Sequence, residues 1–208
     1  MEFVPFEAKY PPEWTNLDGK MVVVANDIGQ TWKAMESLVV AGKTKTIGVC
    51  NFSTQLLRQL LSTAQTIRPS TLQIEVHPQN AQSKLIRFAK ECGLSVTAFS
   101  ILGASSYIEL DMATPDDVLL TNPVIVDIAQ HHHKSSAQVL IRWAMQRETL
   151  PLCKTSNPER MTENRNVFDF ELSKEDMQRI DALDQGRRYN DPGVFCEPGM
   201  GTFCPIYE

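Results

Sequence analysis

Hydrophobic and polar positions follow one another along this chain in a pattern that predicts short strands and helices in turn. From residue 45 onward, apolar runs of strand length alternate with segments whose apolar residues have helical spacing. Strands that alternate with helices imply parallel pairing with helical crossovers. The predicted strands are residues 46–50, Thr71–Glu75, Ser95–Phe99 and Leu150–Cys153, and the predicted helices are residues 54–64, 83–92, 122–132 and 136–147, with two more beginning at Pro158 and Ser173.

Such strand–helix units suit two α/β folds, a closed (β/α)8 TIM barrel or a doubly wound parallel sheet. No G-x-G-x-x-G motif follows any predicted strand, which counts against the common dinucleotide-binding sheet. The barrel is therefore favoured. Because a barrel of this kind needs about eight strands to close and four are predicted, we expect an incomplete barrel with four strand–helix units, a preceding helix and a C-terminal tail.

The first forty residues differ from the rest of the chain. Residues 3–27 are rich in proline, aromatic and turn residues and predict a loop, apart from a weak apolar run at Met21–Ala25. A helix is predicted over Ile28–Val40. Its expected apolar face consists of Trp32, Met35, Leu38 and Val39.

Composition indicates a soluble globular protein, with 42% hydrophobic and 22% charged residues in 208. We expect residues 1–208 to form a single domain, with a C-terminal tail at residues 186–208. The net charge of -5 argues against a nucleic-acid or anionic-membrane partner. The chain also lacks a membrane-length apolar run and a signal-peptide start.

The five cysteines are odd in number and scattered, and no C-x-x-C pair occurs. Neither a zinc site nor a disulfide framework is predicted, and we expect a reducing, cytoplasmic setting. The run His131–His133 ends a predicted helix, where cations complement the helix dipole. This interpretation is preferred to metal binding.

The sharpest chemical feature is the segment Lys154–Asn164, which follows the last predicted strand. Pro158 fits a first helical turn, and the free backbone N–H groups of that turn, with the helix dipole, favour an anion. Lys154 brings a cation from the strand end, and Arg160 can form a forked pair with phosphate oxygens. Further polar groups of the turn come from Thr155, Ser156 and Asn157, all good N-cap residues.

The alternative is a well-capped surface helix with two exposed cations. Position favours a ligand, because barrels place ligands at strand C-termini and bind phosphate in the loops after the last strands. Each charge-assisted hydrogen bond is worth about 1.5–3 kcal/mol. The segment therefore predicts a site for a ligand that carries a phosphate group.

This segment, Lys154–Asn164, resembles the coenzyme-binding segment of the aldo-keto reductases, which use NADPH to reduce sugar and other aldehydes. Residues 47–52 (IGVCNF) are similar to that family's IGVSNF signature, and residues 72–78 (LQIEVHP) resemble its QVExHP strand. Residues 139–143 (VLIRW) and 167–177 also match. The resemblance is nearest to the sugar reductases, namely xylose reductase and the plant hexose-6-phosphate reductases.

The resemblance implies the barrel fold and NADP(H) as coenzyme. It implies that Lys154, Thr155 and Arg160 hold the 2′-phosphate and that Glu163 and Asn164 meet the adenine. The resemblance also implies that Ser156 is one of the residues that bind the coenzyme.

At the nicotinamide end, the resemblance implies that Asn51 and Gln73 bind the carboxamide, which an amide side chain suits because it both donates and accepts hydrogen bonds. The structural alternative is a strand-end Asn in a turn and a Gln in the barrel interior. Ser100 and Leu102 are implied to approach the diphosphate.

The chain departs from the family pattern at several of these positions. Cys50 replaces the usual Ser of the signature and weakens one contact to the carboxamide. Phe99 replaces the Tyr that stacks on the nicotinamide ring, and a phenyl face can still stack. Ile101 stands in place of Pro, and Gln79 in place of Tyr.

The family's catalytic Tyr, Lys, Asp and His lie on its first four strands and have no counterpart in this sequence. No catalytic residue is therefore assigned, and His77 is interpreted as a structural histidine at a strand end. Proton donation to the developing alkoxide is typically worth about 10²–10⁴-fold in rate. We therefore predict that this chain alone has little or no reductase activity.

Two functions remain open at this stage. One is NADPH-dependent reduction of sugar or sugar-phosphate aldehydes to alcohols, with this sequence as an incomplete version of the enzyme. The other is a catalytically inactive NADP(H)-binding or partner-binding protein. Open strand edges and an uncovered apolar interior predict self-association or pairing with another chain. The resemblance implies that the tail at residues 186–208 shapes the substrate pocket.

Overall fold

The computed structural model describes residues 2–3, 23–24, 27–64, 66–110 and 112–191. The chain divides into two compact units. The first contains residues 1–47, 52–68 and 191–208, and the second contains residues 48–51 and 69–190. The expectation of a single domain stays a prediction, and each unit is described by itself.

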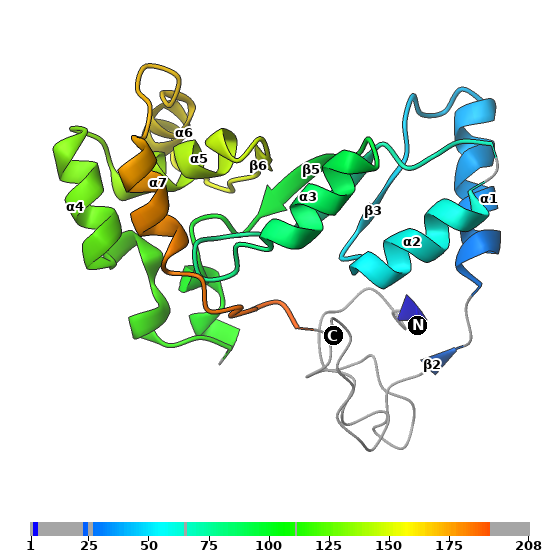
Figure 1. Cartoon of the computed structure of the whole chain (residues 1–208), viewed down its shortest axis with the longest axis horizontal. Coiled ribbons are helices and arrows are strands. Elements are labelled where there is room, and N and C mark those ends of the chain that lie inside the picture. Colours follow the sequence, from blue (N-terminus) through cyan, green and yellow to red (C-terminus); the bar gives the residue numbers. More distant parts are fainter. Residues whose placement is uncertain (1, 4–22, 25–26, 65, 111, 192–208) are drawn as a thin grey trace. The chain divides into compact units, whose positions relative to one another are not determined.

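A four-stranded parallel sheet forms the centre of the second unit (Figure 1). Its strands are β3 (Gly48–Cys50), β4 (Thr71–Glu75), β5 (Ser95–Phe99) and β6 (Leu150–Pro151), in the order β3-β4-β5-β6. All three pairings are parallel. The helices are α3 (Ser83–Glu91), α4 (Pro123–His131), α5 (Ser136–Gln146), α6 (Pro158–Arg165) and α7 (Lys174–Asp181). The structure is thus an α/β partial barrel, as predicted.

The two faces of the central strands differ in chemistry, because side chains alternate along a strand. The buried face carries Leu72, Ile74, Val96 and Ala98. The opposite face of β4 and β5 is half-exposed and carries the polar side chains of Thr71, Gln73 and Thr97. On β4 and β5 this face is therefore mostly polar, with Phe99 as its apolar side chain, and the expected self-association stays a prediction.

Exposed apolar side chains gather instead at β6. Leu150 is paired with Thr97 of β5, so it lies on the half-exposed face of the sheet. Leu150 is 57% exposed and Leu152 is 53% exposed. Among the described strands, β6 has a neighbour on one side only, so it forms an edge of the sheet.

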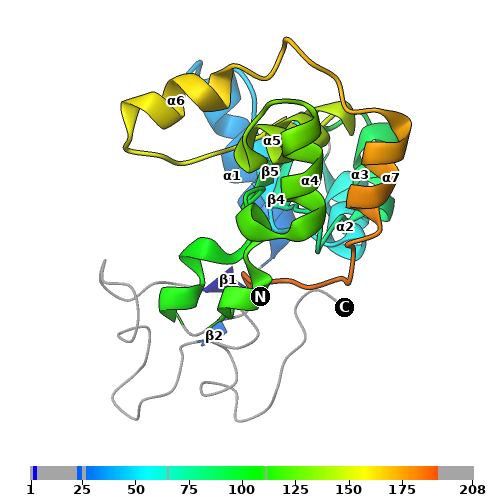
Figure 2. The ribbon, with the colours of Figure 1, turned by 90° about the vertical axis from the view of Figure 1, so that its left-hand side faces the viewer.

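Helices α4, α5 and α7 pack together, as Figure 2 shows. Their starts follow from side-chain caps. Asn122 caps α4, Ser135 and Gln138 form a capping box at α5, and Ser173 forms one with Asp176 at α7. The helix starts predicted at about residues 122, 136 and 173 are confirmed.

Between β5 and α4 the chain forms a loop of short 3₁₀ helices, η1 (Ala104–Ser106), η2 (Ile108–Leu110), η3 (Pro115–Asp117) and η4 (Leu119–Thr121). Gly103 begins the loop at φ +83°, and Leu119 occupies the space that a Cβ at Gly103 would need. Ile101, Ala104 and Leu119 are fully buried. The loop is thus anchored to the core at both ends.

In the first unit, α1 (Ile28–Val40) packs on α2 (Thr54–Thr63). Trp32 is buried as predicted, and its Nε1 donates to the carbonyl of Ile67 at 2.8 Å. Leu38 is 36% exposed, whereas the polar Glu36 is buried on the predicted apolar face. Glu36 is buried because its Oε1 accepts from the backbone N–H groups of Thr66 and Ile67, at 3.2 and 2.9 Å.

The N-terminal segment predicted as loop contains two short strands. β1 (Glu2–Phe3) pairs with β2 (Val23–Val24) in antiparallel orientation, and β2 falls inside the weak apolar run at Met21–Ala25. In the described part of the chain, no helix has both the length and the apolar character to cross a membrane.

Candidate functional site

A pocket of about 250 Å³ lies where β6 ends and α6 begins. Its wall includes the start of α5 and residues of the loop after β5. The predicted coenzyme residues that line it are Leu102, Lys154, Thr155, Arg160, Glu163 and Asn164, and the other lining residues are Leu120, Ser135, Ser136 and Ala137. The fold thus brings Leu102, from the loop after β5, into the same pocket as residues of the continuous segment Lys154–Asn164.

The start of α6 differs from the prediction in one respect. The side-chain oxygen of Asn157 accepts hydrogen bonds from the backbone N–H groups of Glu159 and Arg160, at 2.8 and 3.2 Å. Pro158 has no N–H. The N–H groups expected to bind an anion are therefore already occupied, because Asn157 is an effective N-cap.

Anion binding at this turn consequently depends on side chains. Lys154 and Arg160 are exposed, and neither forms an ion pair with a described residue. The Thr155 hydroxyl accepts from the Asn157 N–H at 3.1 Å and keeps its own proton to donate. We call Lys154, Thr155 and Arg160 the phosphate clamp. Ser156 is exposed and does not line the pocket.

The first turn of α5 was missed as part of the site. Ser135 caps this helix by accepting from the Gln138 N–H at 3.3 Å, and Ser135, Ser136 and Ala137 line the pocket. The positive end of the helix dipole lies there, and the first turn carries no acidic residue. Sequence pattern predicts such a capped start, but only packing shows that it borders the pocket.

A second group of predicted residues meets at the ends of β3 and β4. Cys50 pairs with Gln73 in the sheet, and the Cys50 Sγ lies 3.9 Å from the Gln73 Oε1. The Asn51 backbone N–H donates to the Gln73 carbonyl at 2.9 Å, and Asn51 has φ +57°. Burial raises the pKa of the Cys50 thiol. The structure thus places these three residues side by side.

Asn51 has a further feature that bears on ligand binding. Its side-chain Oδ1 is buried and has no hydrogen-bond partner in the described structure. An unpaired buried acceptor costs about 1–3 kcal/mol unless a donor reaches it. The group therefore fits a ligand that presents an N–H, as a carboxamide does.

The remaining predicted residues follow β5. Phe99 is half-buried at the strand end, opposite Glu75 in the sheet register. Ser100 has φ +56°, and its Oγ is hydrogen-bonded to the Tyr107 hydroxyl at 2.8 Å. The Ser100 carbonyl accepts from the Gly103 N–H at 2.9 Å, which closes a turn around Leu102.

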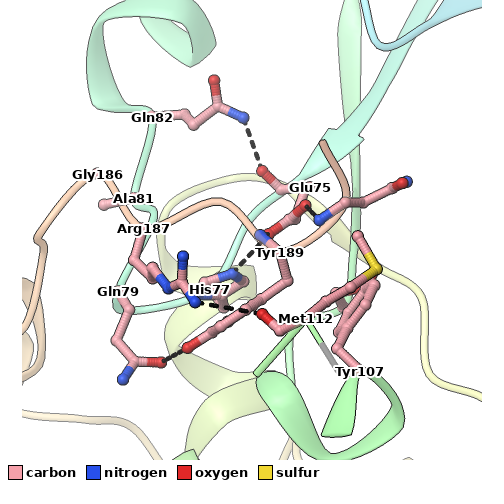
Figure 3. A network of polar contacts seen from close by, with 12 residues as sticks. Glu75, His77, Gln79, Ala81, Gln82, Tyr107, Met112, Gly186, Arg187 and Tyr189 are labelled. Atoms are coloured by element: carbon pink, nitrogen blue, oxygen red, sulfur yellow. Dashed lines mark hydrogen bonds and ion pairs between the residues drawn. The ribbon is translucent and has the colours of Figure 1, made fainter. Parts of the chain in front are cut away.

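His77 is fully buried, in agreement with its structural interpretation. Its Nε2 lies 2.9 Å from the Glu75 Oε1, and its ring stacks on Tyr189 (Figure 3). Burial alone would raise the pKa of Glu75, but hydrogen bonds from His77 and from the backbone of Tyr189 and Asn190 hold that pKa below its usual value. Tyr189, predicted in a loop, is 1% exposed.

The predicted histidine cluster has a structural partner. The Nε2 of His132 lies 2.9 Å from the Asp176 Oδ2, so it joins the end of α4 to the start of α7. Within the described residues, no group of His, Cys, Asp and Glu side chains is arranged to hold a metal ion.

The sequence matches the aldo/keto reductase family over residues 7–185. It is 45% identical to a probable NAD(P)H-dependent D-xylose reductase of Emericella nidulans, over 92% of this chain and 60% of that protein. It is also 45% identical, with the same coverage, to the NAD(P)H-dependent D-xylose reductase of Candida tenuis.

A solved structure agrees with this fold. The aldose reductase of Schistosoma japonicum superposes with a TM-score of 0.73 at 34% identity, over 84% of this chain and 53% of that one. The chain therefore spans about 60% of the length of these curated relatives. With its parallel sheet, its pocket after β6 and the sequence match over residues 7–185, the chain belongs to the aldo/keto reductase family.

Proposed function

We propose that this chain supplies the coenzyme-binding residues of a reductase that converts sugar aldehydes to alcohols with NADPH. The curated relatives named above are NAD(P)H-dependent D-xylose reductases, which supports both the class of coenzyme and the class of substrate. NADP(H) is the preferred coenzyme in this proposal, and the substrate is an aldose or its phosphate.

The observation that carries the proposal is the phosphate clamp. Lys154 and Arg160 bring two cations to one pocket and form no ion pair with a described residue. NADPH differs from NADH by a 2′-phosphate, which such a pair of cations favours. Glu163 and Asn164 line the same pocket and are proposed to contact the adenine.

The nicotinamide end of the coenzyme is proposed to lie at Asn51 and Gln73. The buried, unpartnered Oδ1 of Asn51 accepts from the carboxamide N–H. Gln73 is half-exposed, and its backbone carbonyl accepts from the Asn51 N–H at 2.9 Å. Phe99 offers a ring for stacking, and Cys50 contributes a weak S–H donor.

Bound coenzyme would supply the hydride, and this chain's residues would hold and orient it. The family's proton-donating Tyr and its Lys, Asp and His partners have no counterpart in this sequence. Reduction of an aldehyde needs that acid assistance. We therefore expect the purified 208-residue chain to bind NADPH and to show little or no turnover of D-xylose.

Fluorescence titration of the full chain with NADPH and NADH tests the proposal. Arg160→Ala and Lys154→Ala should each weaken NADPH binding by about 10- to 100-fold, which corresponds to the loss of charge-assisted hydrogen bonds. Binding of NADH should change little. Arg165→Ala is the matched control, because Arg165 is exposed on the same helix but does not line the pocket. Unchanged NADPH affinity in both clamp variants would falsify the placement of the 2′-phosphate.

The exposed edge at β6 favours a second candidate, a protein that binds coenzyme and a partner without catalysis. Leu150 and Leu152 expose apolar side chains at this edge of the sheet, where a further strand could pair. Self-association through this edge predicts a concentration-dependent mass in sedimentation, abolished by Leu150→Lys. Turnover of D-xylose by the chain alone would exclude this non-catalytic candidate.

A further inference from the structure

A buried carboxylate at the end of β4 holds the segment that follows α7. The Oε1 of Glu75 accepts from the Tyr189 N–H at 2.8 Å, and its Oε2 accepts from the Asn190 N–H at 2.7 Å. His77 Nε2 lies 2.9 Å from the same Oε1. Glu75 and His77 are both fully buried, and Figure 3 shows them facing the tail segment. A strand end and a distant part of the chain are thus fixed to each other.

Tyr189 extends this network to the loop of 3₁₀ helices. Its ring lies between His77 and Tyr107, with ring centroids 4.9 and 5.6 Å apart and interplanar angles of 27° and 23°. Its hydroxyl donates to the Gln79 Oε1 at 2.8 Å. On the loop side, Arg187 donates to the Met112 carbonyl at 3.2 Å. The tail therefore contacts both the strand end and the loop.

Tyr107 connects the stack to the candidate site. Its hydroxyl is hydrogen-bonded to the Ser100 Oγ at 2.8 Å. Ser100 also closes the turn to Gly103, and Leu102 within that turn lines the pocket of the phosphate clamp. A continuous series of contacts thus leads from Glu75 to the pocket wall.

We propose that the tail latch, which consists of Glu75, His77, Tyr107 and Tyr189, positions Ser100 and the turn that presents Leu102 to the coenzyme. Tyr107 and Tyr189 are positioning residues, because they act through Ser100 and do not line the pocket. This inference rests on the proposed coenzyme site. It adds that the tail after α7 controls coenzyme affinity through two tyrosine side chains.

The physical basis is the direction of the Ser100 hydroxyl. When the Tyr107 hydroxyl donates to the Ser100 Oγ, Ser100 keeps its own proton to donate to an anionic oxygen of the coenzyme diphosphate. Hydrogen bonds arranged in series polarise one another. Without Tyr107, the Ser100 hydroxyl rotates among its staggered positions and the donor is no longer preorganised.

Two ligands allow the two ends of the coenzyme site to be tested separately. NADPH would occupy the whole site, whereas 2′-AMP carries only the adenosine and the 2′-phosphate and would occupy the clamp alone. Tyr107→Phe keeps the ring stack and removes the hydroxyl. It should weaken NADPH binding roughly 3- to 10-fold, as expected for one neutral hydrogen bond, and leave the affinity for 2′-AMP unchanged.

A double-mutant cycle tests whether Tyr107 acts through Ser100. In a Ser100→Ala background, Tyr107→Phe should cause no further loss of NADPH affinity. Additive losses would show that Tyr107 has a separate role and would overturn the inference. Tyr189→Leu removes the stack and should weaken NADPH binding, whereas Tyr189→Phe keeps the ring and should bind NADPH with nearly native affinity.

The outcomes distinguish this inference from the proposed function. If 2′-AMP binds and Arg160→Ala weakens it, the clamp stands, and an unchanged NADPH affinity in Tyr107→Phe then overturns the tail latch alone. If the native chain binds neither NADPH nor 2′-AMP, both proposals are wrong. If every variant melts within a few degrees of the native chain, a loss of affinity cannot be attributed to unfolding.

Discussion

The phosphate clamp and the tail latch use charged side chains in opposite ways. Helix α6, which carries Arg160, has no buried residue, and Lys154 is exposed before it. In the tail latch, Glu75 and His77 are fully buried and bonded to each other. Exposed cations retain their hydration and remain available to a ligand. A buried carboxylate must have its hydrogen bonds satisfied within the fold.

Because of this difference, changes in the clamp and changes in the latch should affect different properties of the protein. Removing a side chain of the clamp leaves nothing buried and unpaired, so it should affect ligands and hardly affect folding. Removing Glu75 leaves two backbone N–H groups and a histidine without their acceptor. The latch should therefore dominate the free energy of unfolding, while the clamp dominates coenzyme selectivity.

The largest expected effect comes from Glu75→Ala. Because the change leaves buried donors unpaired, it should lower the free energy of unfolding by about 3–5 kcal/mol. Urea unfolding followed by circular dichroism measures it. The matched control is Glu159→Ala in the exposed first turn of α6, which should stay within about 0.5 kcal/mol. Equal losses in the two variants would contradict the comparison.

Acid should weaken the latch by protonating the same carboxylate. The pKa of Glu75 is held below its usual value of 4.5 in the folded chain. Its contribution to stability is therefore fully present above pH 4.5 and is lost as the pH falls through the lowered folded pKa. In urea unfolding between pH 6 and about pH 3, Glu75→Gln should lose less stability than the native chain. Identical pH dependence in both proteins would exclude Glu75 as a contributor.

The smallest expected effect lies at the clamp. Asn157→Ala removes the side-chain cap from two backbone N–H groups of α6 and should cost about 1 kcal/mol of stability. It also frees those N–H groups for an anion. NADPH affinity should therefore fall less than in Arg160→Ala, and a larger fall would mean that Asn157 itself contacts the coenzyme.

Local pattern predicted the elements that have strong internal signals. The strands Thr71–Glu75 and Ser95–Phe99 and the helix Ile28–Val40 have the predicted bounds. β6 is shorter than predicted, since it ends at Pro151. Proline has no N–H to donate, and it accordingly lies at the edge strand of this sheet.

Contacts between distant segments escaped prediction. Glu36 is polar and yet buried, because it accepts hydrogen bonds from the backbone N–H groups at residues 66–67. The sequence predicts Tyr189 in a tail, but its ring stacks on His77 and is buried. The N–H groups at the start of α6 were expected to be free, but Asn157 binds them. For Glu36 and Tyr189 a partner from a distant segment decides the role, whereas at α6 a neighbouring side chain occupies the N–H groups.

The sequence by itself determined the family resemblance, the alternation of strands and helices, and the cluster of cations at Lys154–Asn164, because these depend on residue type and short spacing. Only the tertiary structure decided that Leu102 and the start of α5 join that cluster in one pocket. It also decided that Glu75 fixes the tail through Tyr189. The physical reason is that burial and hydrogen-bond pairing are properties of segments that meet only on folding.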